Sequence, residues 1–419
     1  MAREYARWQK KSVDRSLKTR RVVYLSGARQ SGKTTLIKQY INDENQYRSL
    51  DDPGLLKVAL EDPLGFVKSV GNARNSGGTM IIDEVQKAPD LIPSIKMYVD
   101  ANNRPGQFLL TGSANFHNLP TVTESLAGRI SKIHLRPLSI GEILERKATF
   151  FHKAFEQDWP LQIKGYDKQA VIGMAFRGGF PESLHLPARD RMIWHLDYAN
   201  TLLERDLKDI ANIRRKAAMR KILETLTAWS GKFMDTAGLC GQLAITKGLF
   251  ETYTNLLETL YLFERVPAWI STDYDRVGKK DKIYVTDTGL MASILNWHLK
   301  EVLLDSDRSG KIVETLVFNE LKAQIDLEYG YSLSQYRDRL GREIDFIVEN
   351  DRGNLLGIEV KAGSAISKDD ARHLAWFARN IAVNKKFIGI VLYTGENVLP
   401  LGENIHAVPI GALWHGDSR

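Results

Sequence analysis

Residues 22–34 read VVYLSGARQSGKT, an apolar run followed by the pattern GxxxxGK[ST], and helix-forming residues follow at positions 35–40. Glycines in such a loop let the backbone turn tightly, so that successive N–H groups point at phosphate oxygens from a helix N-terminus. The lysine reaches the β- and γ-phosphates, and the final hydroxyl is a Mg²⁺ ligand. The strand, the spacing and the helix together predict a phosphate-binding loop.

We expect this loop to bind ATP and Mg²⁺ as cofactors. Within it, Lys33 is also a candidate catalytic residue and Thr34 a candidate metal ligand. A glycine-rich turn that binds no nucleotide is the alternative. The candidate nucleotide-binding residues of the loop are Gly27, Ala28, Arg29, Gln30, Ser31, Gly32, Lys33, Thr34 and Thr35.

A second apolar run, residues 79–82, ends in Asp83 and Glu84. A short continuous apolar segment is typical of a parallel strand that is covered on both faces. Asp83 would hold the Mg²⁺ ion, and Glu84 would polarise the water that attacks the γ-phosphate, as in a Walker B motif. The alternative is a buried strand that ends in a helix N-cap.

A third predicted strand, residues 107–110, is followed by Thr111 and Ser113. We expect one of these hydroxyls, with Ser113 the candidate nucleotide-binding residue, to contact the γ-phosphate or orient the water. A simple Ser/Thr turn is the alternative. Arg129 is a candidate catalytic arginine finger, acting in its own subunit or on a neighbour in a homo-oligomer. A surface arginine is also compatible with the sequence.

The chain has 419 residues, which is too long for one ordinary core and predicts several domains. Its net charge of +7 favours an anionic partner, and we expect DNA. Much of the positive charge lies in residues 3–21. This segment could contact phosphates, or it could form an amphipathic helix whose charged face is solvated.

The single cysteine, Cys240, rules out an intramolecular disulfide and a cysteine zinc site, and it favours a reducing compartment. We therefore expect a cytoplasmic protein. No N-terminal apolar segment resembles a signal peptide, and no window approaches the roughly 18 apolar residues of a membrane span, so no membrane partner is expected.

Residues 216–290 show three helical patterns, through 220–229, 235–240 and 253–260, with a turn at 241–247. Two predicted strands follow, at 262–266 and 282–285. This order favours a winged helix-turn-helix. The loop between the strands contains Arg276, Lys279 and Lys280, which would form a basic wing. Contact with DNA, contact with protein and a purely structural role all stay open.

Residues 342–348 (REIDFIV) and 355–361 (LLGIEVK) alternate in polarity and predict a hairpin. With a period of two, Asp345 would share a face with Glu343 and Ile347. The D…ExK spacing is the signature of the PD-(D/E)xK nuclease fold. Solvent-exposed strand charges are the alternative. The candidate catalytic residues are Asp345, Glu359 and Lys361, and the candidate ligands for Mg²⁺ or Mn²⁺ are Glu314, Asp345 and Glu359.

In this order, the segments GARQSGKTTL, IIDEVQKAPDL, LLTGSANF, ESLAGR, GGFPE, VTDTGL and GREIDF…IEVKAG resemble a large prokaryotic family of P-loop ATPases of the AAA type. Members carry a C-terminal domain of uncharacterised function that is related to PD-(D/E)xK nucleases. The resemblance covers nearly the whole chain. It implies the ATP site, the Walker B pair and the nuclease-like residues given above. The proline that names the nuclease motif is absent, since Ile344 precedes Asp345.

The predicted fold class is α/β, with a parallel-sheet ATPase domain and a C-terminal nuclease-like α/β domain. The expected domains are an AAA-type P-loop ATPase (1–145), a helical lid or connector (146–215), a winged helix (216–290) and the nuclease-like domain (291–419). The leading hypothesis is an ATP-hydrolysing, DNA-associated enzyme, with metal-dependent cleavage by the C-terminal domain left open. The alternative is a nucleotide-dependent regulatory or binding switch whose nuclease fold is inactive.

Overall fold

The computed structural model describes residues 4–42, 46–69, 78–112, 126, 128–206, 216–270 and 280–416. The chain divides into two compact units. The N-terminal unit contains residues 6–137 together with 258–261, and the C-terminal unit contains residues 1–5, 138–257 and 262–419. The finer division into four domains stays a prediction.

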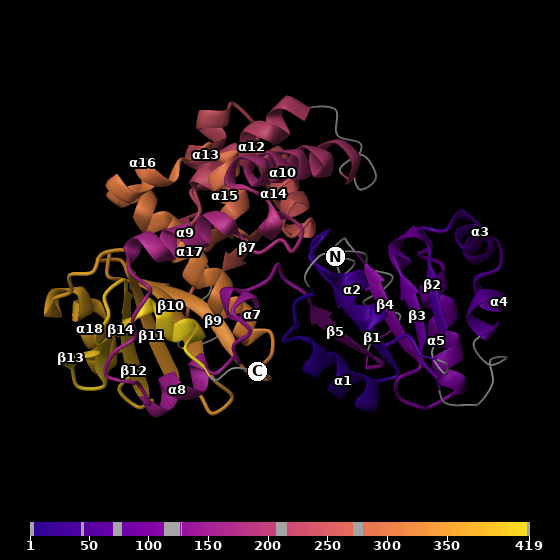
Figure 1. Cartoon of the computed structure of the whole chain (residues 1–419), viewed down its shortest axis with the longest axis horizontal. Coiled ribbons are helices and arrows are strands. Elements are labelled where there is room, and N and C mark those ends of the chain that lie inside the picture. The colour runs from indigo at the N-terminus through magenta and orange to yellow at the C-terminus, as the bar shows by residue number, and fades with distance from the viewer. Residues whose placement is uncertain are drawn as a thin grey trace. The chain divides into compact units, whose positions relative to one another are not determined.

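The N-terminal unit is built on a five-stranded sheet with the order β2-β3-β4-β1-β5, in which every pair of neighbours is parallel (Figure 1). The three central strands are buried along their whole length, which explains why they appear in the sequence as continuous apolar runs. The predicted parallel sheet is confirmed. Its strands are β1 (Val22–Ser26), β2 (Gln46–Ser49), β3 (Met80–Asp83), β4 (Phe108–Gly112) and β5 (Ile130–His134).

Helices cover both faces of this sheet, and β1 shows how its side chains divide between them. Val22 and Tyr24 pack in one apolar cluster with α3, α4 and α5, while Val23 and Leu25 pack in another with α1 and α2. The alternation follows from the period of two along a strand. The helices are α1 (Lys10–Thr19), α2 (Lys33–Lys38), α3 (Pro53–Glu61), α4 (Pro63–Lys68) and α5 (Leu91–Ala101).

The C-terminal unit begins with helical segments that have few strands between them. The predicted run of three helices and two strands over residues 216–290 is present, although the middle helix continues to Leu243. A third short strand completes an antiparallel sheet with the order β6-β8-β7. These elements are α7 (Ile140–Ile143), α8 (Phe150–Glu156), α9 (Lys168–Arg177), α10 (Ala188–Thr201), α12 (Lys216–Ala228), β6 (Lys232–Phe233), α13 (Thr236–Leu243), α14 (Lys247–Thr259), β7 (Phe263–Val266), β8 (Lys282–Val285), α15 (Thr288–Ile294) and α16 (Leu299–Leu304).

A six-stranded mixed sheet with the order β13-β14-β12-β11-β10-β9 completes this unit. The predicted hairpin is confirmed, because β10 and β11 pair antiparallel and Phe346 lies opposite Ile358. Strand β12 then runs parallel to β11. The elements are α17 (Ser306–Ile325), β9 (Ser332–Arg337), β10 (Glu343–Glu349), β11 (Leu355–Lys361), α18 (Arg372–Asn380), β12 (Phe387–Tyr393), β13 (Leu399–Gly402) and β14 (Ile405–Pro409).

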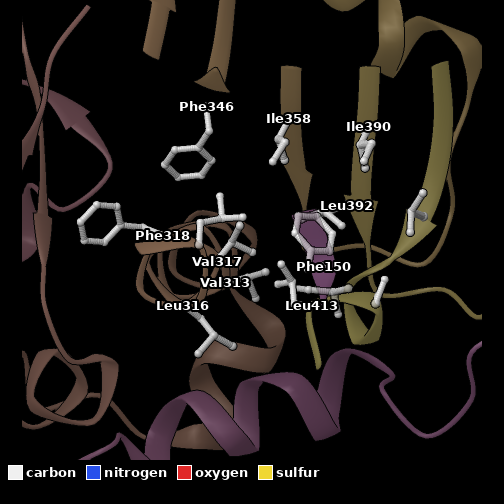
Figure 2. Packing of buried hydrophobic residues seen from close by; sticks show 14 of the residues in the cluster. Phe150, Val313, Leu316, Val317, Phe318, Phe346, Ile358, Ile390, Leu392 and Leu413 are labelled. Carbon is white, nitrogen blue, oxygen red and sulfur yellow. The ribbon is translucent and has the colours of Figure 1, made fainter. Parts of the chain in front are cut away.

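Helix α17 packs against one face of the six-stranded sheet. Figure 2 shows Val317 and Phe318 of this helix on the same side as Phe346, Ile358 and Ile390 of the strands. A separate apolar cluster includes side chains of α18 and of the other face of the sheet. The long helix is therefore fixed against β10 and β11, and this packing decides where its polar side chains lie.

Candidate functional site

The predicted phosphate-binding loop connects β1 to α2. Gly27 and Gly32 have φ values of 153° and 95°, a region that favours glycine. A Cβ atom at Gly27 would lie 2.2 Å from the carbonyl oxygen of Leu135. Gln30, between the two glycines, also has a positive φ of 58°. Both the φ value of Gly27 and the close approach of the Leu135 carbonyl oxygen therefore require glycine at position 27.

Lys33 is almost fully buried, and its ammonium group is held by the loop itself. Its Nζ donates hydrogen bonds to the carbonyl oxygens of Gly27, over 2.9 Å, and Ala28, over 2.8 Å. Burial lowers the pKa of Lys33 to about 8, although the carboxylates of Glu84 and Asp83 act in the opposite direction. The cation thus lies within the loop that is predicted to bind phosphate.

Asp83 is buried at the end of β3 and accepts hydrogen bonds from three hydroxyl groups. Thr34 Oγ1 donates to its Oδ2 over 2.9 Å, and Tyr47 donates to the same oxygen over 3.1 Å. The hydroxyl of Thr111 donates to Oδ1. Burial, with the Asp83 charge, raises the pKa of Tyr47 to about 12, so this hydroxyl stays protonated. A hydroxyl and a carboxylate in direct contact fit the oxygen ligands that Mg²⁺ prefers.

Glu84 follows Asp83 in a left-handed conformation, with φ of 59°. Its backbone N–H donates to Thr111 Oγ1 over 3.1 Å, and Gln86 Nε2 donates to its carboxylate. Backbone conformations of this kind persist where the surroundings fix them, and they are common at functional sites. Thr111 therefore contacts both members of the predicted Walker B pair.

The two remaining residues predicted for the nucleotide site are Ser113 and Arg129. Ser113 lies outside the described residues. Arg129 directly precedes β5, whose first residue pairs with Val22 at the start of β1. The loop follows the last residue of β1, so about 13 Å of strand separates the two positions. This register argues against a finger role for Arg129 in its own chain. Its Nη2 donates to Asp100 over 3.0 Å, and this contact lowers the pKa of Asp100.

The sequence did not identify Arg7 as part of this site. Its Nη1 donates to the carbonyl oxygen of Ser31 over 2.6 Å, and its Nη2 donates to that of Arg136 over 2.6 Å. The side chain is buried, with 7% of its surface exposed. Neither of the two roles expected for the basic residues 3–21 therefore describes Arg7, which links the phosphate-binding loop at Ser31 to the backbone at Arg136.

The C-terminal unit brings predicted nuclease-like residues together around a lysine that the sequence did not single out. Lys282 Nζ, on β8, lies 3.1 Å from Glu314 Oε1 on α17 and 2.9 Å from Asp345 Oδ1 on β10. It also lies 2.7 Å from Glu343 Oε1. Only 1% of Lys282 is exposed. We refer to Glu314, Glu343, Asp345 and Glu359 as the acidic centre.

Three ionisable groups of this cluster, Lys282, Glu314 and Glu359, have pKa values shifted from their ordinary range. Burial alone would lower the pKa of Lys282, but Asp345 and Glu314 raise it well above its ordinary value. Burial raises the pKa of Glu314 to about 7, and the charge of Asp345 acts in the same direction. The same two causes raise the pKa of Glu359 well above its ordinary value. Two of the four carboxyl groups, Glu314 and Glu359, therefore keep their protons to a higher pH than usual, beside one ammonium ion.

Strand β10 does not keep the regular alternation of side chains that we expected from the sequence. Its register with β9 shifts between Ile344 and Ile347. Glu343 and Asp345 share a face, as predicted, because both contact Lys282. Ile347 packs in the cluster that contains α18, so the prediction that it shares the face of Asp345 is wrong. The irregularity reverses the alternation at this point, as a β-bulge does.

The predicted metal site also needs correction. Among the described residues, no group of three histidine, cysteine, aspartate or glutamate side chains is arranged to hold a metal ion. The ammonium of Lys282 occupies the position between Glu314 and Asp345, so these residues do not fit a divalent cation in this arrangement. Lys361 has its Nζ 3.8 Å from Asp370. The predicted use of Mn²⁺ has no support here.

The predicted basic wing is described only in part. Arg276 and Lys279 lie outside the described residues, and Lys280 forms an ion pair with Asp235 over 3.2 Å. At the start of α14, Lys247 lies 3.6 Å from Glu251. DNA contact by this region stays a prediction. Of the helices that the structure describes, none has the length and apolar character needed to cross a membrane.

Comparison with sequence families assigns three segments of the chain. Residues 19–144 match an AAA domain, which supports an AAA-type ATPase and agrees with the coarse prediction. Residues 168–301 match a domain of unknown function (DUF8612), and residues 309–413 match another (DUF4143). These two matches provide no support for nuclease activity.

In sequence, the chain is similar to two proteins named as uncharacterised, Rv2008c of Mycobacterium tuberculosis and Mb2031c of Mycobacterium bovis. Each is 26% identical over 397 residues, which is 94% of this chain and 81% of the relative. Among solved structures, the Aeropyrum pernix ORC1 protein in complex with DNA is 12% identical and has a TM-score of 0.27, covering 71% of this chain and 94% of that one.

The Thermotoga maritima RuvB Holliday junction branch migration motor is 20% identical, also with a TM-score of 0.27, and the match covers 62% of this chain and 88% of that one. TM-scores of this size do not establish a shared overall fold.

Proposed function

We propose that the N-terminal unit binds and hydrolyses ATP. The observation that carries this proposal is the 2.9 Å hydrogen bond between Thr34 and Asp83, which joins the phosphate-binding loop to the end of β3. Lys33 is buried in the same loop. The match of residues 19–144 to an AAA domain supports the same activity.

Each residue of the site has a separate role in binding or hydrolysing ATP. The backbone N–H groups of residues 27–34 bind the phosphates, and Lys33 neutralises charge on the β- and γ-phosphates. Thr34 and Asp83 would hold Mg²⁺, which neutralises charge on the phosphate oxygens when it is bound. Glu84 orients the attacking water and accepts its proton. Thr111 and Tyr47 fix the carboxylate of Asp83 through their hydroxyl groups.

Measurement of phosphate release tests this proposal. Lys33→Ala should reduce ATP turnover by roughly 100-fold or more, since it removes a charge that stabilises the transition state. Lys38→Ala is the matched control, because Lys38 lies on the same helix with an exposed side chain. Equal turnover by wild type and Lys33→Ala would rule out the assignment.

We also propose that the chain associates with DNA. The net charge of +7 supports an anionic partner. The order of α12, β6, α13, α14, β7 and β8, with the antiparallel sheet β6-β8-β7, is compatible with a winged helix. The single cysteine supports a reducing compartment, and we propose the cytoplasm. A homo-oligomer in which Arg129 acts on a neighbouring subunit stays a prediction.

For the C-terminal unit, a specific observation favours the second candidate function, a nucleotide-dependent switch with an inactive nuclease fold. Asp345 and Glu359 lie on the β10–β11 hairpin and Glu314 lies on the preceding α17, an order compatible with the proposed nuclease-like fold. The ammonium of Lys282 lies among them, and hydrolysis with a metal ion would need that position. A nicking assay with Mg²⁺ and with Mn²⁺ tests this reading, which predicts no cleavage by the wild type.

A further inference from the structure

The side chain of Gln86 contacts the proposed catalytic carboxylate. Gln86 lies two residues after Glu84, in the segment IIDEVQKAPDL, on the short turn Val85–Lys87. Its Nε2 donates a hydrogen bond to Oε2 of Glu84. In the described part of the chain, no other side chain donates a hydrogen bond to this carboxylate. The orientation of the Glu84 side chain therefore depends on Gln86.

Glu84 is held at its backbone as well, and its charge reaches the phosphate-binding loop. Its N–H donates to Thr111 Oγ1 over 3.1 Å, and its φ of 59° is a conformation that persists only where neighbouring groups fix it. Burial lowers the pKa of Lys33, and Glu84 is the carboxylate that opposes this shift most strongly. The carboxylate that Gln86 holds is thus close enough to the loop lysine to stabilise its charge.

The turn that carries Gln86 is fixed on both sides of this residue. Val85 and Ala88 have no exposed surface and pack in the apolar cluster that contains side chains of α5. The ammonium group of Lys87 pairs with Asp51 over 2.6 Å. The amide of Gln86 therefore extends from a backbone position that cannot move without disrupting the packing of the unit.

The carbonyl end of the Gln86 amide lies against Gly112, at the end of β4. A Cβ atom at this glycine would lie 3.0 Å from Oε1 of Gln86 and 2.3 Å from the hydroxyl oxygen of Tyr24. Burial raises the pKa of Tyr24, with Tyr261 and Glu84 acting in the same direction, so this hydroxyl stays protonated. Glycine leaves room for both groups, and their close approach keeps Oε1 on this side and Nε2 toward Glu84.

The chemistry of hydrolysis requires a carboxylate in a defined position. Water attacks the γ-phosphorus, the bond from phosphorus to the β–γ bridging oxygen breaks, and the carboxylate takes a proton from the water. A misplacement of about 1 Å can reduce the rate of such a step roughly 100-fold. An amide that holds one carboxylate oxygen leaves the other to accept the proton and prevents free rotation of the group.

We propose that Gln86 is a positioning residue for ATP hydrolysis, which fixes the carboxylate of Glu84 with Oε2 bound to the amide and Oε1 left for the attacking water. The proposal rests on the ATPase activity proposed for the N-terminal unit and adds a residue to it. In this role Gln86 touches neither the phosphates nor the water, so it acts only through Glu84.

The test uses the full chain with ATP and Mg²⁺ and measures kcat, the affinity for ATP and thermal unfolding. Gln86→Met keeps the length of the side chain and removes the donor. We expect kcat to fall roughly 10- to 100-fold, with unchanged ATP affinity and unchanged stability. Lys87→Met is the matched control on the same turn, because its ammonium group pairs with Asp51 and not with Glu84.

A second comparison separates positioning from a direct role. The rate of hydrolysis in a single turnover is measured for Glu84→Gln alone and for Glu84→Gln combined with Gln86→Met. A residue that acts only through Glu84 loses its effect once that carboxylate is gone, so the two rates should be equal.

Several outcomes would overturn the proposal. One is a folded Gln86→Met chain with the wild-type kcat. Another is a further loss of rate in the Glu84→Gln background, since Gln86 would then act on ATP or water itself. A loss of ATP affinity or stability that accounts for the whole fall in turnover would assign Gln86 to structure.

A variant that fails to fold does not end the test. Gln86→Asn keeps an amide but places it one methylene group short of Glu84, and the same fall in kcat is expected. Failure of both variants to fold would assign Gln86 to structure alone.

Phosphate release by the wild type separates this proposal from the proposed function. A wild type that releases no phosphate would defeat the ATPase activity, and the role of Gln86 with it. Hydrolysis that Lys33→Ala abolishes but Gln86→Met leaves unchanged would defeat only the role of Gln86.

Discussion

Thr34 and Asp83 are 49 residues apart in the chain, and the hydroxyl of one donates a 2.9 Å hydrogen bond to the carboxylate of the other. Strands β1 and β3 are not neighbours in the sheet, since β4 lies between them. Parallel strands nevertheless bring their carboxyl ends to one edge, where α/β folds bind ligands. The contact therefore creates a combined hydroxyl and carboxylate site from two separate sequence motifs.

Arg7→Ala should weaken ATP binding by about tenfold or more and lower the free energy of unfolding by roughly 1 to 3 kcal/mol. The substitution leaves the carbonyl groups of Ser31 and Arg136 without their donor, and the loop loses support. Titration with ATP and denaturant unfolding measure the two effects. Arg15→Ala, with an exposed side chain on α1, is the control.

Arg7→Lys should recover only part of the affinity, because a single ammonium group lacks the fork of donors that spans two carbonyl groups. A loss of stability in Arg7→Ala with unchanged ATP affinity would limit Arg7 to a structural role.

Tyr47→Phe should raise the Mg²⁺ concentration needed for half-maximal ATP turnover by about tenfold, with little change in metal-free ATP binding. The hydroxyl of Tyr47 orients the carboxylate of Asp83, and loss of such outer partners typically costs 10- to 100-fold in metal affinity. Tyr40→Phe is a matched control, because its hydroxyl bonds to Asp14 instead. An identical Mg²⁺ dependence in wild type and Tyr47→Phe would contradict this role.

Glu320→Gln should stabilise the C-terminal unit above neutral pH. Burial raises the pKa of Glu320 to about 8, so the folded state holds a proton that the unfolded state releases near pH 4.5. Stability therefore falls as the pH rises from about 5 to 8, by on the order of 3 kcal/mol. The substitution keeps an acceptor for the N–H of Ile140, which donates to Glu320 over 2.7 Å.

Denaturant unfolding at pH 5, 6.5 and 8 measures this slope, and Glu328→Gln at an exposed position is the control. We expect the wild type to lose stability across the series and Glu320→Gln to lose much less. Parallel curves for the two proteins would show that Glu320 titrates normally.

Binding of duplex DNA should weaken steeply as salt rises, with a log–log slope of roughly −0.9 per phosphate that the protein neutralises. Lys247→Ala, at the start of α14, should reduce the magnitude of that slope by about 1 if this helix contacts the backbone. Fluorescence anisotropy between 50 and 200 mM salt measures both. Absence of binding at low salt would leave the β6-β8-β7 module with a structural or protein-contact role.

Local patterns predicted several elements in both units. The strand and helix around the phosphate-binding loop, the strand that ends at Asp83 and the hairpin with Asp345 are all defined by spacing or by alternation along a short segment. These features depend on neighbours within about ten residues, so one sequence is enough to recognise them.

Features that depend on distant pairing could not be predicted in this way. Lys282 is 63 residues from Asp345, and the sequence shows it only as the first residue of an apolar strand. Arg7 is 129 residues from Arg136. The position of Arg129 depends on the register between β5 and β1, and that of Ile347 on an irregularity between β10 and β9. Each is decided by tertiary packing that no local pattern encodes.

The nucleotide retained by Glu84→Gln shows whether this carboxylate activates the water that attacks ATP. The chain is incubated with ATP and Mg²⁺, separated from free nucleotide and quenched, and the bound ATP and ADP are quantified. We expect ADP on the wild type and ATP on Glu84→Gln, because the variant keeps the phosphate-binding loop but lacks the carboxylate that activates water. Conversion of ATP to ADP by Glu84→Gln at the wild-type rate would contradict this role.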